Sequence, residues 1–385
     1  MNRPCRWLLI VAALIAYGSL FPFGFALPAS FGAFWSELLA QRRLWTGLGD
    51  VAGNILLFVP LGVSGVLCVG RARMTVLRGA LLLVAATAFS FAVQVLQVFE
   101  PVRDPALSDV FWNALGTLAG IVAGVAVERH VALLPRAAWA RSRFAVLLIA
   151  AWTAAELWPF VPALDWFALK QALKGLLRAA DFSLASFAYH LASVLALGLL
   201  LAACSPTPRV GARLALLVFG VLAGKLVLYA SPLSPSFALG AVAGVALWAG
   251  WGARLGRPVL LAALGAMLAA YTVRALVPFE LRSAPAPFAW IPFQALLQGS
   301  MMANVRSLLA QLFALGTMLW LVERVGGRVA GAAAALALWV GLVEWAQRWI
   351  VGRTPDVTMP LLVIALAVVL VRIGRDEARP PPAIV

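Results

Sequence analysis

The chain of 385 residues is 63% hydrophobic and only 12% charged, which excludes an ordinary soluble globular protein. Its formal net charge is +15, and the basic residues lie in short clusters between long apolar runs rather than in one patch. That distribution is typical of the cytoplasmic loops of a membrane protein and argues against nucleic acid as a partner.

The apolar runs reach the length of about 20 residues that a membrane-spanning helix needs, and they are continuous rather than alternating. We therefore predict an all-α integral membrane protein with about twelve transmembrane helices. The predicted spans are 6–26, 50–70, 77–99, 107–127, 143–162, 183–204, 212–231, 235–253, 258–278, 304–323, 328–350 and 357–374.

The basic residues set the predicted orientation. With the N-terminus inside, the inner segments carry eighteen Lys and Arg and the outer segments nine, so both termini are expected in the cytoplasm. Two outer segments, 31–45 and 164–180, combine Trp, Phe and Leu with Lys and Arg at helical spacing. This pattern predicts short helices lying in the outer interface.

Three predicted spans end in an apolar residue followed by Pro-Phe, at Pro22, Pro159 and Pro278. A Leu-Gly pair follows each proline, with its glycine 40, 39 and 38 residues later. Such regularity predicts three parallel repeats of four helices. We place the repeats at 1–128, 143–255 and 258–374, followed by a disordered tail at 375–385.

A polar stretch separates the third predicted span from the fourth. Gln94 and Gln97 lie one helical turn apart, Arg103 lies in the loop, and Asp109 and Asn113 share one face of the next helix. Polar groups at this depth are costly unless they have partners. The stretch is therefore either a hydrogen-bonded clasp or a binding site.

The segment DVAGNILLFVPLG (50–62), followed by Q-x-x-Q, the arginine and D-x-x-x-N-x-x-G, resembles the VanZ-like family of bacterial membrane proteins. The resemblance covers residues 1–128 and departs from the family at Gln94, where a Glu is usual. It implies a bacterial cytoplasmic (inner) membrane location. It also implies an effect on susceptibility to teicoplanin-type antibiotics, without fixing a mechanism.

The third repeat carries the Glu that the first repeat lacks. Glu344 and Gln347 match the two glutamines of the first repeat, and nine residues separate Glu344 from Arg353, as they separate Gln94 from Arg103. We expect the loop after Arg353 to be shortened.

The middle repeat is the most eroded. Asp50 and Asn54 of the first repeat correspond to serine and His190 in the middle one, and Lys225 stands where the Glu is expected, inside a predicted span. A charge at that depth should face the protein interior. Glu156 is one candidate partner, and His190 is read as a core hydrogen-bonding residue in preference to a proton path.

Arg103 and Arg353 can each bind phosphate or carboxylate bidentately, or can clasp nearby helix ends and acids. We predict an outward-facing site assembled from helix ends of the first and third repeats. Its predicted ligand-binding residues are Asp50, Asn54, Gln94, Gln97, Arg103, Asp109, Asn113, Glu344, Gln347 and Arg353, with Lys225 as an intramembrane charge.

The predicted function is binding of an anionic envelope ligand, which is a lipid head group, a lipid carrier or a cell-wall precursor. Membrane lipids are the expected partners, and the sequence leaves the oligomeric state open. The alternatives are a secondary transporter, an enzyme acting on a lipid-linked substrate and a scaffold. No nucleophile or phosphate-binding glycine loop accompanies Glu344, which disfavours catalysis.

No cofactor or metal site is expected, because the three cysteines, Cys5, Cys68 and Cys204, have no metal-ligand spacing and the chain has only two histidines. We read the cysteines as small apolar packing residues.

Overall fold

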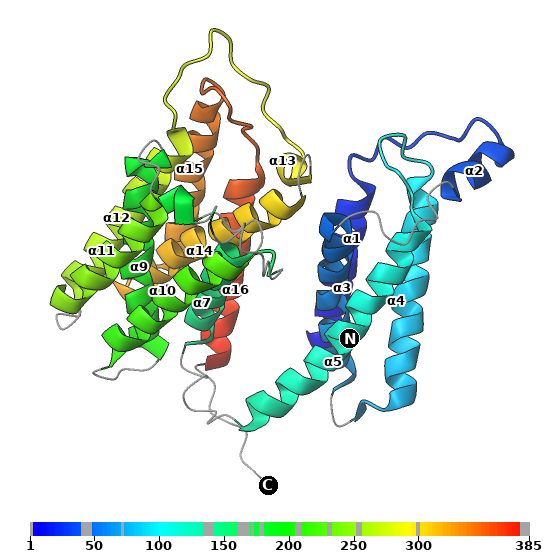
Figure 1. The fold of residues 1–385 in the computed structure, drawn as a ribbon, viewed down its shortest axis with the longest axis horizontal. Coiled ribbons are helices and arrows are strands. Elements are labelled where there is room, and N and C mark those ends of the chain that lie inside the picture. The colour runs from blue at the N-terminus through cyan, green and yellow to red at the C-terminus, as the bar shows by residue number, and fades with distance from the viewer. Residues whose placement is uncertain are drawn as a thin grey trace. The chain divides into compact units, whose positions relative to one another are not determined.

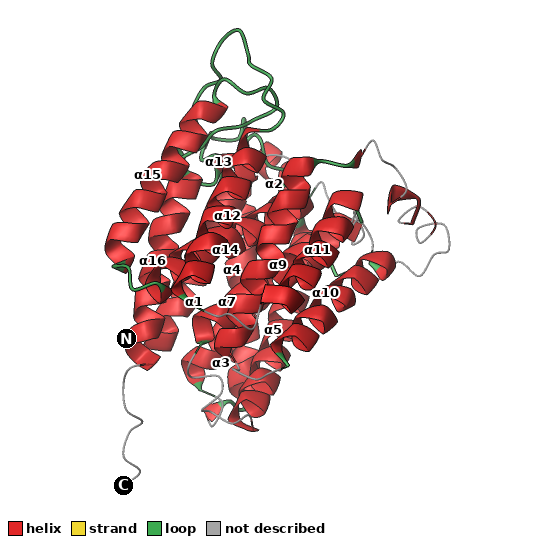
Figure 2. Cartoon of the chain, turned by 90° about the vertical axis from the view of Figure 1, so that its left-hand side faces the viewer, coloured by secondary structure: helices red, strands yellow, loops and turns green. Residues whose placement is uncertain are grey.

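The computed structural model describes residues 3–39, 48–70, 73–133, 142–160, 170, 173–176, 181–204, 209–228, 233–251, 256–297 and 301–377. Within these residues the regular elements are helices, joined by loops, with no strand (Figure 2). The chain divides into two compact units, Met1–Arg136 and Ala137–Val385, and each is described by itself.

The first unit is a small helical bundle. Its helices are α1 (Arg3–Leu20), α2 (Phe31–Leu38), α3 (Leu48–Val69), α4 (Val76–Gln97) and α5 (Leu107–Leu133). Helix α3 packs on α1 and α5, and α4 packs on α5 (Figure 1). Ile15, Phe58, Leu61 and Ala86 form the buried apolar cluster of this unit.

Glycines bring α3 and α5 into close contact. A Cβ atom added at Gly116 would lie 2.2 Å from the carbonyl oxygen of Ile55, and one at Gly120 would lie 2.2 Å from that of Val59. The two backbones therefore approach to a distance that only glycine allows, which is a common device between membrane helices.

The second unit is larger. Its helices are α7 (Arg143–Leu157), α9 (Leu184–Cys204), α10 (Val210–Val227), α11 (Pro235–Trp251), α12 (Arg257–Leu276), α13 (Gln294–Leu297), α14 (Met301–Arg324), α15 (Val329–Gln347) and α16 (Thr358–Glu377). Helices α9 and α14 carry most of its fully buried side chains, such as Leu197 and Leu315. Helices α7 and α12 each pack on both α9 and α14, so the second and third predicted repeats share one core.

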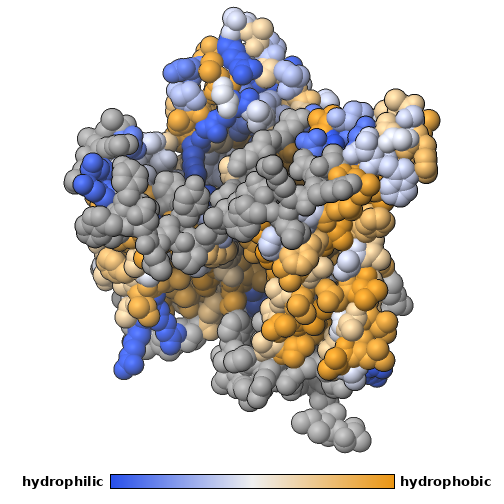
Figure 3. Space-filling model, turned by 45° about the vertical axis from the view of Figure 1, so that its right-hand side comes forward, coloured by the Kyte–Doolittle hydropathy of each residue, from blue (hydrophilic) through white to orange (hydrophobic). Residues whose placement is uncertain are grey.

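Eight of the described helices are long and apolar enough to cross a membrane, and α1, α11 and α16 hold shorter apolar stretches. A described helix occupies each of the twelve predicted spans. Many large apolar side chains are exposed, Val76 and Leu216 among them. In the face drawn in Figure 3, hydrophobic residues form a broad area and hydrophilic residues lie mostly nearer its upper and lower edges. The chain is a multi-pass helical membrane protein, as predicted.

The three Pro-Phe turns are alike in structure, and each has a cis X-Pro bond and a Phe with positive φ. The same hydrogen bond closes each turn, from the Phe amide to the carbonyl three residues earlier: Phe23 to Leu20 at 3.0 Å, Phe160 to Leu157 at 3.0 Å and Phe279 to Leu276 at 2.9 Å. This likeness supports the three repeats, whose boundaries stay a prediction.

Other local predictions have mixed outcomes. Helix α2 falls within the predicted interfacial segment 31–45, whereas segment 164–180 is described only at residues 170 and 173–176. Helix α16 continues to Glu377, and the rest of the predicted tail lies outside the described residues. Cys5 and Cys68 form a disulfide with Cα atoms 4.5 Å apart, so the packing interpretation is wrong for this pair.

Candidate functional site

In the first unit the polar stretch holds the end of α1. Arg103 donates from Nε to the carbonyl of Phe21 at 2.7 Å and from Nη2 to that of Gly18 at 3.1 Å. Gln97 donates to the carbonyl of Ser19 at 2.8 Å. These side chains satisfy carbonyls that the helix end leaves without partners. Burial lowers the pKa of Arg103, which Glu100 raises in part, and the guanidinium stays charged.

The remaining predicted residues of the first repeat connect α3, α4 and α5. Gln94 accepts a hydrogen bond from the Ala106 amide at 2.8 Å, and Asn113 donates to the buried hydroxyl of Ser90 at 2.9 Å. Asp109 is hydrogen-bonded to the side chains of Gln94 and Asn54. Asp50, in the first turn of α3, is close enough to Asp109 to interact with it electrostatically. In this unit the polar side chains form the clasp, one of the two predicted alternatives.

The third repeat reproduces this clasp. Arg353 donates from Nε to the carbonyl of Val277 at 2.9 Å and from Nη2 to that of Arg274 at 2.7 Å, at the end of α12. Glu344 accepts a hydrogen bond at 3.3 Å from the amide of Asp356, which lies twelve residues later in the chain. Gln94 likewise accepts a hydrogen bond from the amide of Ala106, also twelve residues later. Since the same spacing and contacts recur, the expected shortening of the loop after Arg353 is wrong over this stretch.

The second unit contains a cavity of about 910 Å³ between its two predicted repeats. Lys225, Glu344, Gln347 and Arg353 line it, which are all of the predicted site residues that fall in this unit. The other seven lie in the first unit. The walls are the ends of α7, α10, α12 and α15 and the starts of α9, α11, α14 and α16, so the cavity opens among helix ends of one side of the bundle.

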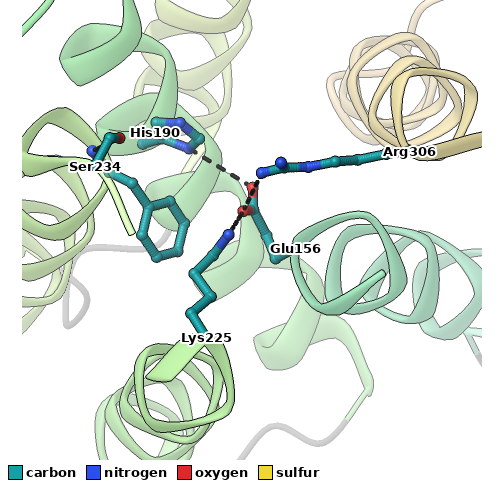
Figure 4. Close-up of polar contacts among 6 residues, drawn as sticks. Glu156, His190, Lys225, Ser234 and Arg306 are labelled. Atoms are coloured by element: carbon teal, nitrogen blue, oxygen red, sulfur yellow. Dashed lines mark hydrogen bonds and ion pairs between the residues drawn. The ribbon is translucent and has the colours of Figure 1, made fainter. Parts of the chain in front are cut away.

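Glu156 is the centre of a charged cluster in this cavity. Its Oε2 lies 2.7 Å from Nζ of Lys225 and 3.8 Å from Nη2 of Arg306, and its Oε1 lies 3.8 Å from Nδ1 of His190. Figure 4 shows the three nitrogen-bearing side chains converging on this one carboxylate from α9, α10 and α14. Lys225 is fully buried and its Nζ lies 4.5 Å from the centre of the Phe237 ring.

The structure corrects the depth of Lys225. The sequence places it inside a span at 212–231, but α10 ends at Val227, and Lys225 lies in the last turn. The backbone of Leu228 is already extended, although the apolar sequence continues past it. Hydropathy therefore overestimates the length of this helix. The predicted candidate partner, Glu156, is the observed one.

Arginine and aromatic side chains form another part of the wall. The guanidinium of Arg274 lies 4.2 Å from the centre of the Tyr189 ring, which is a cation–π contact. Tyr189 and Tyr271 are both buried and line the cavity.

The acids near Arg353 are held by backbone amides. Asp356 accepts from the Thr358 amide at 2.8 Å and is also hydrogen-bonded to the backbone of Ala295. Burial raises the pKa of Asp356, and its hydrogen bonds with Thr358 partly oppose this. Burial and the neighbouring Arg274 lower the pKa of Arg353, which Glu344 raises in part.

The cavity carries an excess of positive charge. Four cations, Lys225, Arg274, Arg306 and Arg353, line it against three acids, Glu156, Glu344 and Asp356. Among the described residues no group of three His, Cys, Asp or Glu side chains could hold a metal ion. The arrangement is suited to binding an anion.

The site prediction did not include Glu156, His190, Arg274 and Arg306. The sequence contains a signal for the two arginines, because Arg274 and Arg306 lie within or at the edges of predicted spans. A charge inside a membrane is energetically costly, so such residues commonly have a functional role. Glu100 of the first unit was also missed, and it is 1% exposed with neither carboxylate oxygen hydrogen-bonded among the described residues.

The chain is a multi-pass helical membrane protein whose second unit has a charged cavity among its helix ends. Residues 8–128, within the first unit, match the family described as VanZ/LLP1. The predicted resemblance is thereby confirmed. No curated protein and no solved structure matches the chain.

Proposed function

We propose that this VanZ-like protein binds an anionic ligand, carrying a phosphate or carboxylate group, in the cavity of its second unit. The observation that carries the proposal is the convergence of Lys225, Arg274, Arg306 and Arg353 on one cavity with only three acids. Lys225 is buried, Arg306 and Arg353 are half-buried and Arg274 is exposed. The guanidinium groups therefore lie where an incoming anion can reach and pair with them.

The identity of the cations supports an oxyanion. Guanidinium groups present a planar fork that matches phosphate and carboxylate oxygens, and an ammonium adds a compact point charge. Arg306 retains 33% side-chain exposure, so a ligand can reach it without unfolding the wall.

The rest of the lining suits a ligand with an apolar part. Trp158, Phe237, Leu296 and Met359 line the same cavity as the cations. Ligand sites commonly combine a mostly apolar wall with a few placed polar groups. A lipid head group with part of its chain, or a prenyl phosphate, has this chemistry, whereas a cell-wall peptide terminus offers the carboxylate alone.

A position on the outer side of a bacterial inner membrane is part of this proposal, and the positive-inside count supports it, because the cavity lies at the helix ends opposite the predicted inner loops. Binding an envelope precursor or lipid there would link the protein to envelope composition and to susceptibility to envelope-targeting antibiotics.

The test is native mass spectrometry of the detergent-purified chain with three probes: dilauroyl phosphatidic acid, farnesyl phosphate and an N-acylated peptide ending in D-Ala-D-Ala. We expect saturable binding of at least one probe. The variants Arg306→Gln and Arg274→Gln should each weaken it at least tenfold.

The matched control is Arg372→Gln. Arg372 is an exposed arginine thirteen residues along α16 from Met359 of the cavity wall, or about 20 Å at the helical rise, and its replacement should leave binding unchanged. Equal binding by the wild type and both cavity variants would refute the proposal. Counterflow of the bound probe in proteoliposomes would instead identify the protein as a transporter of that ligand.

A further inference from the structure

We infer that the carboxylate of Glu156 occupies the position of the ligand's anionic group and must be displaced when the ligand binds. This inference rests on the proposed function and deepens it, because it names the subsite and the group that competes for it. The ligand group would be a phosphate or carboxylate held between Lys225 and Arg306.

The geometry places one carboxylate where an external anion would be held. Oε2 of Glu156 is shared between Nζ of Lys225 at 2.7 Å and Nη2 of Arg306 at 3.8 Å. Because both cations approach the same oxygen, Lys225 and Arg306 are close enough to each other for one phosphate to bridge them. His190, 3.8 Å from the other oxygen, adds a third nitrogen from another helix.

The cluster is also incompletely hydrogen-bonded. The distance between Lys225 and Glu156 is that of a close ion pair, in which one carboxylate faces the ammonium. Nδ1 of His190 is buried with no hydrogen-bond partner among the described residues. An ammonium has three donors, so a phosphate with several oxygens could satisfy it better than the fixed side chain does.

The three acids of the cavity have different surroundings. Glu344 accepts the Asp356 amide, and Asp356 accepts the Thr358 amide, so these two carboxylates hold backbone. Glu156 instead lies among side-chain cations.

Displacement has a measurable consequence. While Glu156 occupies the subsite, only the fraction of molecules with the carboxylate withdrawn can bind, and the apparent dissociation constant rises by the inverse of that fraction. Neutralising Glu156 removes this competition. Neutralising another acid of the cavity removes negative charge but leaves the competitor in place.

The experiment titrates dilauroyl phosphatidic acid into the detergent-purified full chain by native mass spectrometry. We expect Glu156→Gln to bind at least tenfold more tightly than the wild type. The comparison variant, Glu344→Gln, changes an acid of the same cavity that accepts a backbone amide, and it should tighten binding at least threefold less than Glu156→Gln does. Size-exclusion chromatography and thermal unfolding establish that each variant is folded.

A second variant covers the case in which Glu156→Gln does not fold. Glu156→Asp keeps the charge but withdraws the carboxylate by one methylene, and it should also tighten binding, because the shorter side chain reaches Lys225 less well. Equal gains from Glu156→Gln and Glu344→Gln, or no gain from Glu156→Asp, would overturn the displacement while leaving anion binding intact. Failure of the wild type and every variant to bind any of the three probes would instead overturn the proposed function itself.

Discussion

Nζ of Lys225 lies 2.7 Å from Oε2 of Glu156, so a buried ion pair ties the last turn of α10 to the last turn of α7. Removing one member of such a pair leaves the other charge buried without its nearest partner. The pair therefore contributes to stability as well as to the site.

Replacing Lys225 by Met should lower the free energy of unfolding by about 3 kcal/mol, because breaking a buried pair from one side is costly. The double variant Lys225→Met/Glu156→Gln should recover more than half of that loss, since neither charge remains. Thermal unfolding in detergent measures both. The exposed Lys170→Met is the control. A double variant no more stable than the single one would contradict this account.

Replacing Arg103 or Arg353 by Ala should destabilise the protein by about 1.5–3 kcal/mol each, the range for hydrogen bonds from a charged group. Each arginine donates to two carbonyls at a helix end, of α1 and of α12 respectively. Lysine should restore less than half of either loss, because it lacks the planar fork. Thermal unfolding with Arg372→Ala as the control measures the effect. Full rescue by lysine would show that the charge alone matters.

Gly116→Ala and Gly120→Ala should each cost about 1–3 kcal/mol through overpacking of α3 against α5. The added Cβ would meet a carbonyl oxygen at 2.2 Å at either position. Gly79→Ala is the control, since a Cβ there has nothing within 4 Å and alanine favours the helix. Limited proteolysis and thermal unfolding report the result. Wild-type stability in both α5 variants would mean that the helices can separate at little cost.

The Cys5–Cys68 bridge tests the orientation. The positive-inside count puts both residues at the cytoplasmic face, where thiols are kept reduced. We expect alkylation in intact cells to label both, and purification in air without alkylation to leave them joined. The mass of the intact protein, measured before and after reduction, counts how many cysteines were alkylated in the cell. Cys204 is not in a disulfide, so it serves as the internal reference for alkylation. A bridge already present in alkylated cells would reverse the predicted orientation.

Asp356 should give the stability a pH dependence. Burial raises its pKa in the folded protein above the unfolded value of about 4. Its contribution is therefore fully present below that unfolded value and is lost as pH rises through the folded pKa. Asp356→Asn should remove this decline while still accepting the Thr358 amide. The test is to measure the stability of the wild type and of Asp356→Asn against pH. If stability falls with rising pH as steeply in the variant as in the wild type, the decline belongs to another group.

Much of the fold follows from the sequence because it depends on hydropathy and local turns. Runs of apolar residues place each long helix, and the Leu-x-Pro-Phe pattern recurs with one backbone conformation at Phe23, Phe160 and Phe279. Helix ends are less predictable. At Leu228 the chain becomes extended although its side chain is apolar, so the predicted span runs too far.

The candidate site could be predicted only in part. Spacing alone pairs Glu344 with Arg353 and Gln94 with Arg103, and the structure gives these pairs matching roles. Spacing does not show that both arginines bind helix-end carbonyls, because those carbonyls lie about 80 residues away in the chain. They are also backbone groups, which every residue carries, so a pattern of side chains does not reveal them.

The sequence by itself determined the class of protein, the helices and the VanZ-like first unit, since burial of apolar runs in lipid and short-range turn chemistry are local properties. Only the tertiary structure decided which charges meet. Glu156, His190, Lys225 and Arg306 come from four helices, and their convergence depends on how α7, α9, α10 and α14 pack. Ion pairing falls steeply with distance, so no reading of spacing along the chain could replace that packing.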